Sequence, residues 1–542
     1  MDAAFAVPEP RNEPPRAYAP GSAERSSLER RLGELAAQRL DLTMTIGGQQ
    51  RMGDGIEIGV VQPHKHGHVL GVTHNATNDD AAAAVAAAKK AAPGWRDLPY
   101  AERAAVFLRA AELLAGGWRD TLNAATILGQ SKSVYQAEID AACELIDFLR
   151  FNAAFGQRIL GEQPESSKGM WNRFDHRPLE GFVYAITPFN FTAIAGNLPS
   201  APALMGNTVI WKPSPTQQLA AHFTMRLFEA AGLPPGVINL VTGDGLAVSE
   251  VVLADPDLAG IHFTGSTATF RHLWQEVGSH IDRYRSYPRV VGETGGKDFV
   301  FAHASADVDA LHTALVRGAY EYQGQKCSAA SRAYVPRSIW DGGLRDRLAA
   351  TVAAIQYGDV TDLSTFGGAV IDGRAFAKLA AALDRIKNSA SCTVLAGGTA
   401  DDSEGWFVAP TLVECSDPTH EVFSTEYFGP ILAVYVYDDG DFETTLELAD
   451  SASPYALTGS IFATDRAVIE RAGAALRFTA GNFYINDKPT GAVVGQQPFG
   501  GARGSGTNDK AGSVLNLYRW VSPRTIKETF EPPVAWRYPH MG

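Results

Sequence analysis

The chain has 542 residues, of which 45% are hydrophobic and 20% are charged, and its formal net charge is -13. A chain of this length exceeds a single hydrophobic core, so we expect two or three domains. The acidic balance argues against a nucleic-acid partner, because phosphate backbones recruit clustered Lys and Arg, and a small-molecule substrate is expected instead.

The cysteine spacing and the apolar runs indicate the cellular compartment in which the protein works. Four cysteines stand at wide spacing without a C-x-x-C pair: Cys143, Cys327, Cys392 and Cys415. This spacing predicts neither a disulfide framework nor a metal site, and a working thiol fits a reducing compartment. The first residues include Asp2 and Glu9 and show no secretory signal or acid-poor transit peptide, and no apolar run reaches membrane-spanning length. We therefore expect a soluble cytoplasmic protein with no membrane partner.

The amino-terminal part of the chain predicts an extended arm followed by hairpin strands. The arm and a helix are expected over 1–45, because the proline-rich stretch to about Pro20 cannot bury much apolar surface. Alternating residues over 43–72 predict strands, on which three histidines share one face: His64, His66 and His68. A metal site at these histidines is the less favoured interpretation, since no Cys or carboxylate cluster accompanies them. Helices are predicted over 78–92 and 101–115.

From Gly181 the sequence alternates between strand and helix patterns. Strands are predicted over 182–186, 207–211, 237–241 and 261–263, and helices over 193–204, 216–231 and 267–277. Such alternation predicts a parallel sheet that binds a nucleotide at the carboxyl ends of its strands. With the preceding helices, this region forms the expected nucleotide-binding domain over 46–154 and 181–293.

The usual dinucleotide fingerprint is absent, because Gly243-x-Gly245 has Val248 where the third glycine belongs. Gly265 and Ser266 instead open the helix predicted over 267–277, where free backbone N–H groups and a hydroxyl face an expected pyrophosphate. An ordinary Ser N-cap is the alternative interpretation of Ser266.

A second alternating region begins near residue 298 and predicts a catalytic domain over 294–487. It contains a strand over 299–302, a helix over 307–322, the loop around Cys327 and a strand over 333–335. Two remaining pieces, 155–180 and 510–542, are strand-compatible, with aromatic residues expected to be exposed: Trp171, Tyr518 and Trp520.

Three residues indicate covalent chemistry on a carbonyl. Cys327 stands in Gly-Gln-Lys-Cys-Ser-Ala-Ala-Ser-Arg, Glu293 in Gly-Glu-Thr-Gly-Gly-Lys, and Asn190 in Thr-Pro-Phe-Asn-Phe. A thiol can attack an aldehyde, an amide N–H can stabilise the oxyanion, and a carboxylate can activate water against a thioester. The adjacent Lys326 is expected to favour the thiolate. The other three cysteines lack such a setting and are interpreted as structural.

These motifs, in this order, resemble the aldehyde dehydrogenase superfamily, and within it the enzymes that oxidise L-glutamate 5-semialdehyde. Further matching motifs are Asn-Glu-Pro at 12–14, Glu-Leu-Ile-Asp-Phe at 144–148, Phe-Thr-Gly-Ser at 263–266, Glu-Tyr-Phe-Gly-Pro at 426–430 and Gly-Gln-Gln-Pro-Phe-Gly-Gly-Ala-Arg at 495–503. The resemblance covers about residues 12–530. It implies an α/β fold with a Rossmann-type NAD domain, an α/β catalytic domain and a small β oligomerisation flap, made by the pieces 155–180 and 510–542.

The resemblance also assigns cofactor and substrate residues, position by position. The implied NAD contacts are Thr187, Phe189, Lys212, Gly265, Ser266, Thr267, Ala268, Thr269, Glu426 and Phe428. The implied substrate contacts are Glu144, Phe191, Ser328, Gly491, Ala492 and Phe499, with the backbone at Gly491 and Ala492 gripping the substrate carboxylate. Many NAD-preferring relatives carry an acid where this chain has Pro215, so NADP remains an alternative.

Partners and competing functions complete the expectation. The resemblance implies a homo-oligomer and a separate proline dehydrogenase that supplies the substrate, since this chain has no room for one. A coenzyme-A-acylating enzyme would not need Glu293, and a non-catalytic scaffold would not need Cys327 or Asn190. Another hydrolytic aldehyde dehydrogenase, acting for instance on succinate semialdehyde, is the serious alternative because it would share every catalytic motif.

Overall fold

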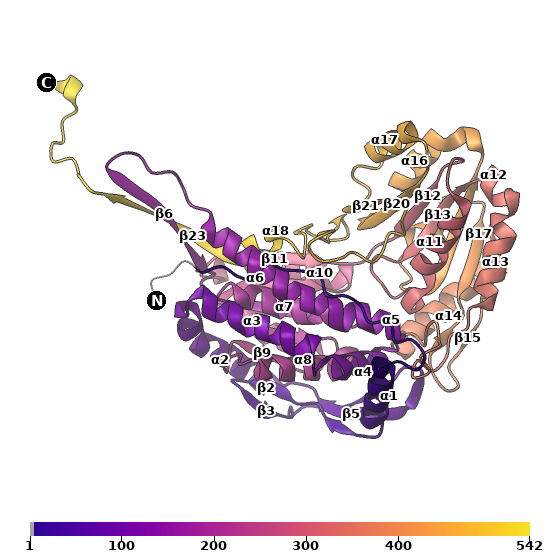
Figure 1. Cartoon of the computed structure of the whole chain (residues 1–542), viewed down its shortest axis with the longest axis horizontal. Helices are drawn as coiled ribbons and strands as arrows, with labels where there is room; N and C mark the ends of the chain where they lie inside the picture. The colour runs from indigo at the N-terminus through magenta and orange to yellow at the C-terminus, as the bar shows by residue number, and fades with distance from the viewer. Residues whose placement is uncertain (1–4) are drawn as a thin grey trace.

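Two seven-stranded sheets, each packed against helices, organise the chain in the computed structural model, which describes residues 5–542 (Figure 1). The sheets belong to two lobes that lie side by side, and a long two-stranded hairpin projects from the first lobe. The predicted α/β fold class is thereby confirmed. Among residues 5–542, none of the helices combines the length and apolar character needed to cross a bilayer.

The amino-terminal arm has no regular secondary structure up to α1 (Ala23–Ala36), which begins at the N-cap Ser22. The first four residues of the predicted arm lie outside the described part. A small sheet follows, in the order β1 (Leu40–Asp41), β5 (Lys65–His74) and β4 (Glu57–Gln62), and it accounts for much of the predicted hairpin region.

Five helical segments follow in the first lobe. They are α2 (Asn78–Asp97), α3 (Tyr100–Ala115), α4 (Arg119–Gln130), α5 (Val134–Ala137) and α6 (Leu145–Gly161). Thr77 begins α2 with a capping box to Asp80, which satisfies two free backbone N–H groups. A π-helical turn, η1 (Glu138–Glu144), joins α5 to α6. Such turns are frequent at functional sites, and this one ends at Glu144.

The first large sheet has the strand order β11-β10-β7-β8-β9-β2-β3. Its strands are β2 (Met44–Ile46), β3 (Gln49–Arg51), β7 (Phe182–Thr187), β8 (Thr208–Pro213), β9 (Ile238–Leu240), β10 (Leu258–Thr264) and β11 (Arg289–Glu293). The connecting helices are α7 (Thr192–Leu204), α8 (Gln218–Ala230), α9 (Gly245–Ala254) and α10 (Thr267–Ser279). The strands from β11 to β9 run parallel, and β2 and β3 are antiparallel additions. The predicted strands and helices of this region are confirmed, with bounds that shift by up to three residues.

The strand order of this sheet reverses between β7 and β10. The chain moves outward from β7 through β8 to β9 and then returns to place β10 on the other side of β7. Open parallel sheets bind ligands at the carboxyl ends of the strands, at such a reversal point. Thr187 and Thr264 end the two strands concerned.

The second large sheet has the order β14-β17-β18-β13-β12-β20-β21, and all its neighbours are parallel except β14 with β17. Its strands are β12 (Asp298–Ala302), β13 (Ala330–Pro336), β14 (Cys392–Ala396), β17 (Thr411–Cys415), β18 (Ile431–Tyr437), β20 (Thr458–Phe462) and β21 (Asn482–Ile485). The main helices are α11 (Val308–Tyr320), α13 (Arg345–Ala354), α14 (Gly373–Lys387), α16 (Phe442–Ser451) and α17 (Arg466–Ala475). Apolar clusters that include Val300 and Phe301 pack on opposite faces of this sheet.

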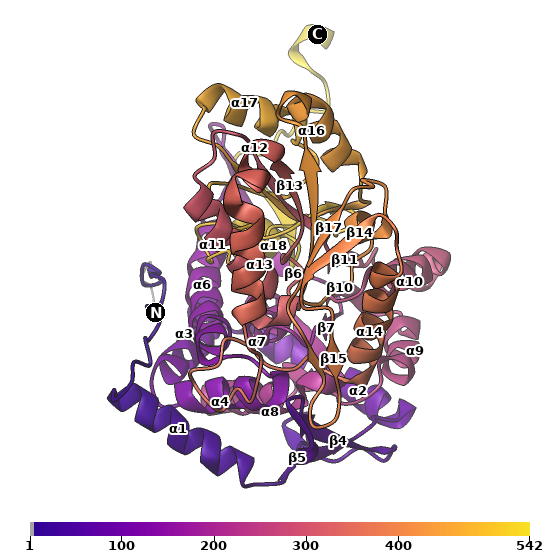
Figure 2. The same ribbon diagram turned by 90° about the vertical axis from the view of Figure 1, so that its right-hand side faces the viewer.

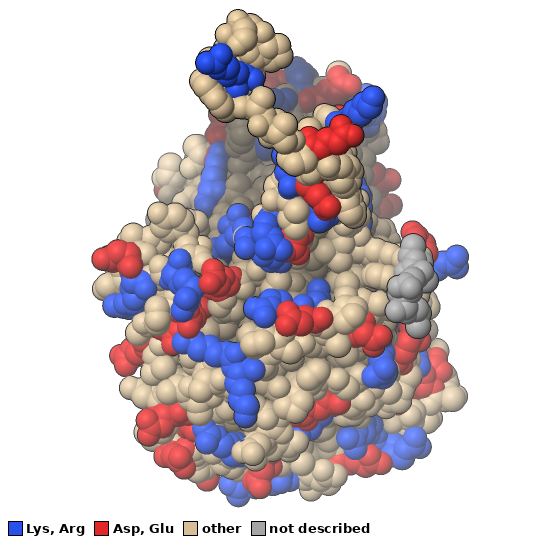
Figure 3. All heavy atoms as spheres, turned by 90° about the vertical axis from the view of Figure 1, so that its left-hand side faces the viewer, with Lys and Arg blue, Asp and Glu red and all other residues tan. Residues whose placement is uncertain are grey.

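The projecting structure is a two-stranded antiparallel ribbon that pairs two segments far apart in the sequence. β6 (Met170–Pro178) and β23 (Val521–Thr529) are antiparallel over nine residue pairs, and the chain continues beyond β23 into a protruding tail (Figure 3). Residues 155–161, predicted to belong to this flap, instead complete α6. The predicted exposure is right for Trp171, which is 50% exposed, but wrong for Trp520, which is fully buried against His262.

Candidate active site

Cys327 lies in a loop whose backbone is held in an uncommon shape. The loop follows η4 (Glu321–Gly324) and precedes β13, and both Tyr322 and Gln323 have left-handed backbone angles, with φ of 50° and 54°. Gly324 is required here, because a Cβ atom at this position would lie 2.3 Å from the carbonyl oxygen of Gly429. Strained backbone of this kind is often retained at active sites.

The Cys327 side chain is 8% exposed, and burial raises the pKa of its thiol well above its usual range. The carboxylate of Glu293 adds to this effect. Gly296, three residues after Glu293, packs against the cysteine backbone, since a Cβ atom there would lie 2.4 Å from the Cys327 carbonyl oxygen. The prediction that Lys326 favours the thiolate is wrong for this structure. The Lys326 ammonium is paired with Glu321 at 3.1 Å, so its charge is already neutralised.

Asn190 is positioned to hold an oxyanion beside Cys327. It lies between β7 and α7, is 3% exposed, and donates one N–H of its amide to the carbonyl oxygen of Gln325 at 3.0 Å. This bond fixes the amide against the cysteine loop. Because an amide nitrogen carries two hydrogens, the second N–H remains available for a substrate oxygen.

Glu293 ends β11 and carries the features of a general base. Its Oε1 atom is shielded from solvent and has no hydrogen-bond partner among the described residues. Burial raises the pKa of its carboxyl to about 8, while the nearby Lys510 opposes that shift. A carboxylate without partners and with a pKa near neutrality is suited to taking a proton from water.

The cofactor residues expected at the β7–β10 reversal do gather there. Thr187 is 3% exposed, and its Oγ1 accepts a hydrogen bond from the Trp211 indole at 2.9 Å. Ser266 caps α10 by accepting from the Thr269 backbone N–H at 3.1 Å, so the N-cap interpretation is correct. The same helix end contains Thr267, Ala268 and Thr269, and the backbone N–H groups of Thr267 and Ala268 are presented where an anion would bind.

Lys212 lies at the end of β8 on the same edge of the sheet. Its side chain is 6% exposed, and burial lowers its pKa to about 8. It has no salt-bridge partner among residues 5–542. A Cβ atom at Gly245 would lie 3.4 Å from the Lys212 Nζ, so glycine leaves this ammonium room to reach a ligand.

Glu426 and Phe428 come from the second lobe and face the first. The Glu426 Oε1 accepts from the Gly296 backbone N–H at 2.8 Å, and a Cβ atom at Gly295 would collide with this carboxylate. Phe428 has a left-handed φ of 59°, and its ring packs edge-on against Phe189 at 5.7 Å between centroids. These contacts join the predicted nicotinamide end of the cofactor site to the loop that follows Glu293.

The expected carboxylate grip lies beside Cys327 in the fold. Ser328 exchanges a hydrogen bond with Thr490 at 2.8 Å, and Thr490 directly precedes Gly491 and Ala492. Gly491 has a φ of +96°, a conformation that L side chains rarely adopt. Phe499 forms a two-way backbone bridge with Ala511, which holds the far end of this loop.

Phe191 and Glu144 approach the same region from the first lobe. The Phe191 ring lies 4.0 Å from the Nζ of Lys132. Burial and the neighbouring Asp140 raise the pKa of Glu144 well above its usual range, and Glu293 contributes to the same shift. A substrate ammonium beside Glu144 would favour its charged form.

Lys132 and Asp140 are two central residues that the sequence analysis missed. Lys132 is fully buried, pairs with Asp140 at 2.7 Å, and places its ammonium 4.5 Å from the ring of Tyr322 as well as above Phe191. Asp140 also accepts from the backbone N–H groups of Thr192 and Ala193, which begin α7. No local motif indicates this pair, because the pair and its partners together come from four separate segments.

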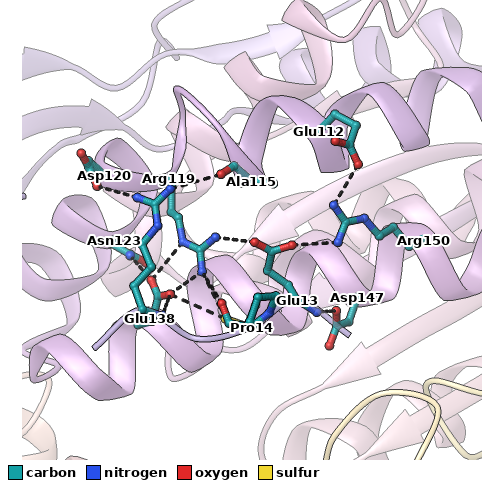
Figure 4. Close-up of polar contacts among 12 residues, drawn as sticks. Glu13, Pro14, Glu112, Ala115, Arg119, Asp120, Asn123, Glu138, Asp147 and Arg150 are labelled. Atoms are coloured by element: carbon teal, nitrogen blue, oxygen red, sulfur yellow. Dashed lines mark hydrogen bonds and ion pairs between the residues drawn. The ribbon is translucent and has the colours of Figure 1, made fainter. Parts of the chain in front are cut away.

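The sequence analysis also predicted no function for the amino-terminal arm. Figure 4 shows that Glu13 bridges two arginines, Arg119 at 2.6 Å and Arg150 at 2.8 Å. The Arg119 side chain is 2% exposed and also pairs with the buried Glu138, the first residue of η1. Glu13 in the arm thus helps to neutralise Arg119, whose other partner, Glu138, begins the π-helical turn that ends at Glu144.

Asn12 connects the same arm to the loop that contains Gly491. Its amide donates to Asp147 at 2.8 Å and to the carbonyl oxygen of Val494 at 2.9 Å, and its own oxygen accepts from Gln496 at 2.9 Å. The arm therefore holds the Glu144 segment and the carboxylate loop together.

The three histidines do not converge in the described part of the chain. His64 approaches Asp359 at 3.3 Å, His66 the Asp402 carbonyl, and His68 the Ala36 carbonyl. A different group of potential ligands does converge: Cys392, Cys415 and His420. The sequence analysis did not anticipate this cluster.

Comparisons with known proteins show which family the chain resembles in sequence and fold. The model of the aldehyde dehydrogenase family matches residues 51–526. The mitochondrial delta-1-pyrroline-5-carboxylate dehydrogenase of Bos taurus is 49% identical over 98% of this chain and 94% of its own. The crystal structure of the delta-pyrroline-5-carboxylate dehydrogenase from Mycobacterium tuberculosis bound with NAD is 64% identical, covers both chains fully and superposes with a TM-score of 0.97. A Thermus 1-pyrroline-5-carboxylate dehydrogenase with bound NAD is 30% identical over 97% of this chain and all of its own, with a TM-score of 0.89.

Proposed function

Because the chain belongs to the aldehyde dehydrogenase family, we propose that it oxidises L-glutamate 5-semialdehyde to L-glutamate with NAD, through a thioester on Cys327. The observation that supports this most strongly is the convergence of three groups that the sequence keeps far apart. Asn190 is bonded to the loop that contains Cys327, and Gly296, three residues after Glu293, packs against the Cys327 carbonyl oxygen. This arrangement supplies a nucleophile, an oxyanion donor and a base in one place.

The residues around the sheet reversal fit NAD. Lys212 is a buried ammonium that forms no salt bridge within the described residues 5–542, and Gly245 leaves space beside it, as a ribose-binding lysine requires. The start of α10 offers N–H groups for the pyrophosphate, and Glu426 offers its second carboxylate oxygen to a ribose hydroxyl. When bound, NAD supplies the hydride acceptor.

Acylation depends on Cys327 and Asn190. Burial raises the pKa of the Cys327 thiol, so its proton must be released to water before its sulfur attacks the aldehyde carbon. The oxyanion that forms is held by the free N–H of Asn190 and by the backbone N–H of Cys327.

Deacylation depends on Glu293. With its Oε1 unpartnered, the ionised carboxylate removes a proton from a water molecule, which attacks the thioester carbonyl. The sulfur of Cys327 leaves, and L-glutamate is released. The same pair of oxyanion donors stabilises this second tetrahedral intermediate.

Substrate choice rests on the two ends of the site. The backbone N–H groups of Gly491 and Ala492 bind the substrate carboxylate, while Glu144 faces its ammonium. Phe191 and Phe499 flank the aliphatic chain, and Ser328 is a polar contact near Cys327. Ala492 offers no hydroxyl, so its backbone must supply the bond.

Several organisational features belong to the same proposal. We divide the chain into an arm and helix (1–45), an NAD-binding domain (46–161 and 181–293), a catalytic domain (294–487) and a flap (162–180 and 510–542). An isolated pair of antiparallel strands is only marginally stable in water, which supports a homo-oligomer in which a partner subunit covers the flap. A free catalytic thiol suits the cytoplasm, and a separate proline dehydrogenase would supply the substrate.

The nucleophile is tested by replacing Cys327 with Ala. We expect no NADH formation from glutamate semialdehyde and an unchanged Kd for NAD, because the nucleophile and the cofactor residues of β7, β8 and α10 lie in different lobes. Substantial NADH production by the purified variant would overturn the assignment of Cys327.

A further inference from the structure

The edge of the second sheet places two cysteines directly opposite each other. β14 is the edge strand and runs antiparallel to β17, and Cys392 is paired in register with Cys415 (Figure 2). Their sulfur atoms lie 3.2 Å apart, although both residues are free thiols. They are separated by 22 residues in the chain and lie outside the active site described above.

The strand geometry brings these two side chains as close as a sheet allows. The Ser416 N–H donates to the carbonyl oxygen of Ser391 at 2.9 Å, so the 391–416 pair is a hydrogen-bonded one. In an antiparallel ladder the next pair, Cys392 with Cys415, is then a non-hydrogen-bonded pair, with Cα atoms about 4.5 Å apart. That separation falls at the short end of the range that a disulfide spans, about 4.4–6.8 Å.

The two thiols differ in a way that assigns them different roles. Cys392 is half-buried on the edge strand, and its sulfur lies 3.8 Å from the Nδ1 atom of His420. Cys415 is 1% exposed, and burial together with Cys392 raises the pKa of its thiol to about 11. An oxidant in solution therefore meets Cys392 first, and Cys415 is placed to react with the product.

We propose that Cys392 and Cys415 form a reversible intramolecular disulfide, with Cys392 as the thiol that reacts with a peroxide and Cys415 as the thiol that resolves it. The Cys392 sulfur attacks one peroxide oxygen, which breaks the O–O bond and gives a sulfenic acid and water. The Cys415 sulfur then displaces the hydroxyl oxygen as a second water and forms the S–S bond. Two thiols lose two electrons and two protons, and hydrogen peroxide is reduced to two waters. A dithiol reductant reverses the reaction by exchange.

A metal centre is the competing use of the same residues, because Cys392, Cys415 and His420 offer three ligand atoms within 4.8 Å of one another. Two observations favour the disulfide. The Nδ1 atom of His420 already accepts from the Val422 N–H at 3.2 Å, as the N-cap of α15 (Glu421–Ser424), so its lone pair is in use. Structural zinc sites also take four protein ligands, and the cluster supplies three.

The pair stands at the base of a segment that reaches the cofactor site. His420 begins α15, and Glu426 follows two residues after that helix ends. Within this segment Glu421 accepts from Arg385 at 2.9 Å and from the Tyr427 hydroxyl at 3.0 Å. The disulfide would therefore form on the same framework that orients Glu426 and Phe428.

The test uses the full-length chain with Cys327→Ala, so that the active-site thiol does not react. After treatment with hydrogen peroxide under non-reducing conditions, the intact chain is expected to become about 2 Da lighter through loss of two hydrogens, and dithiothreitol should restore its mass. Alkylation in denaturant should then modify one cysteine, Cys143, in place of three. Adding Cys392→Ser or Cys415→Ser should abolish the loss of mass, whereas Cys143→Ser should leave it unchanged.

Three results would overturn the proposal. One is the addition of oxygen to Cys392 without loss of mass, and another is a covalent dimer on a non-reducing gel. The third is one zinc ion retained per chain by the reduced protein and lost in Cys392→Ser, which would assign the cluster to a metal. Equal Kd values for NAD in all variants verify that each serine substitution leaves the fold intact.

Discussion

Replacing Glu293 with Gln should make the protein more stable at alkaline pH and at the same time stop its turnover. Glutamine keeps the shape of the side chain but cannot take a proton. In the folded protein, burial raises the pKa of Glu293 from 4.5 to about 8. The folded state therefore holds a proton that the unfolded chain releases, and the free energy of unfolding falls as pH rises from about 4.5 to about 8.

The size of this effect follows from the pKa shift. At about 1.4 kcal/mol per pKa unit, the full shift corresponds to roughly 5 kcal/mol above pH 8, as an upper bound. Water can reach this half-buried side chain, so we expect about 1–3 kcal/mol. Glu293→Gln should thus exceed the unmodified protein in unfolding free energy at pH 8.5 and match it near pH 5.

Two assays on the same variant separate stability from chemistry. Thermal unfolding of the NAD-free protein at pH 5 and pH 8.5 should give a Tm advantage for Glu293→Gln only at the higher pH. Rapid mixing with glutamate semialdehyde and NAD should give a burst of about one NADH per active site, followed by turnover slowed roughly 10²–10⁴-fold. An unchanged steady-state rate would refute the role of Glu293 as the base, and a Tm advantage independent of pH would refute its raised pKa.

Two further predictions concern the substrate loop and the arm. Gly491→Pro removes one backbone donor, so kcat/KM for glutamate semialdehyde should fall by the roughly 1–3 kcal/mol of an unmet charged hydrogen bond, about 5- to 150-fold, while kcat/KM for a simple aldehyde should change much less. Gly491→Ala keeps the N–H and serves as the control for backbone strain. Equal losses on both aldehydes would contradict binding of the substrate carboxylate by this loop. Glu13→Gln removes one of the two carboxylates paired with the buried Arg119 and leaves Glu138, so the free energy of unfolding, measured by urea denaturation, should fall by about 2–4 kcal/mol. The control is Glu112→Gln, because the 71% exposed carboxylate of Glu112 also pairs with Arg150, and it should change the free energy of unfolding by less than about 1 kcal/mol. Similar losses in both variants would contradict the importance of the buried Glu13–Arg119 pair.

The sequence predicted the features that depend on neighbouring residues along the chain. The alternation from Gly181 predicted the strands that end at Thr187 and Pro213, and the motifs around Cys327, Glu293 and Asn190 are each short stretches of neighbouring residues. Once the parallel sheet is accepted, the carboxyl ends of its strands must gather at one edge, which places the cofactor residues.

Features that depend on distant pairing were missed or wrong. Opposition of Cys392 and Cys415 requires the register of β14 on β17, and a shift of one residue would separate the thiols. Lys326 was expected to act on its neighbour Cys327, but its partner is Glu321, across the turn formed by η4. Trp520 was expected on the surface because its segment is strand-like, yet His262 and the Gly260 backbone receive its ring. Such contacts are set by tertiary packing, which has no local signature.

The most direct test of the proposed function is a comparison of semialdehydes by initial rate. Purified protein should be assayed for NADH formation with L-glutamate 5-semialdehyde, succinate semialdehyde and an aldehyde lacking a carboxylate, and with NADP in place of NAD. We predict the highest kcat/KM for glutamate semialdehyde with NAD, because only this substrate engages both the Gly491–Ala492 backbone and Glu144. A higher kcat/KM for succinate semialdehyde would contradict the assigned substrate while leaving the Cys327 chemistry intact.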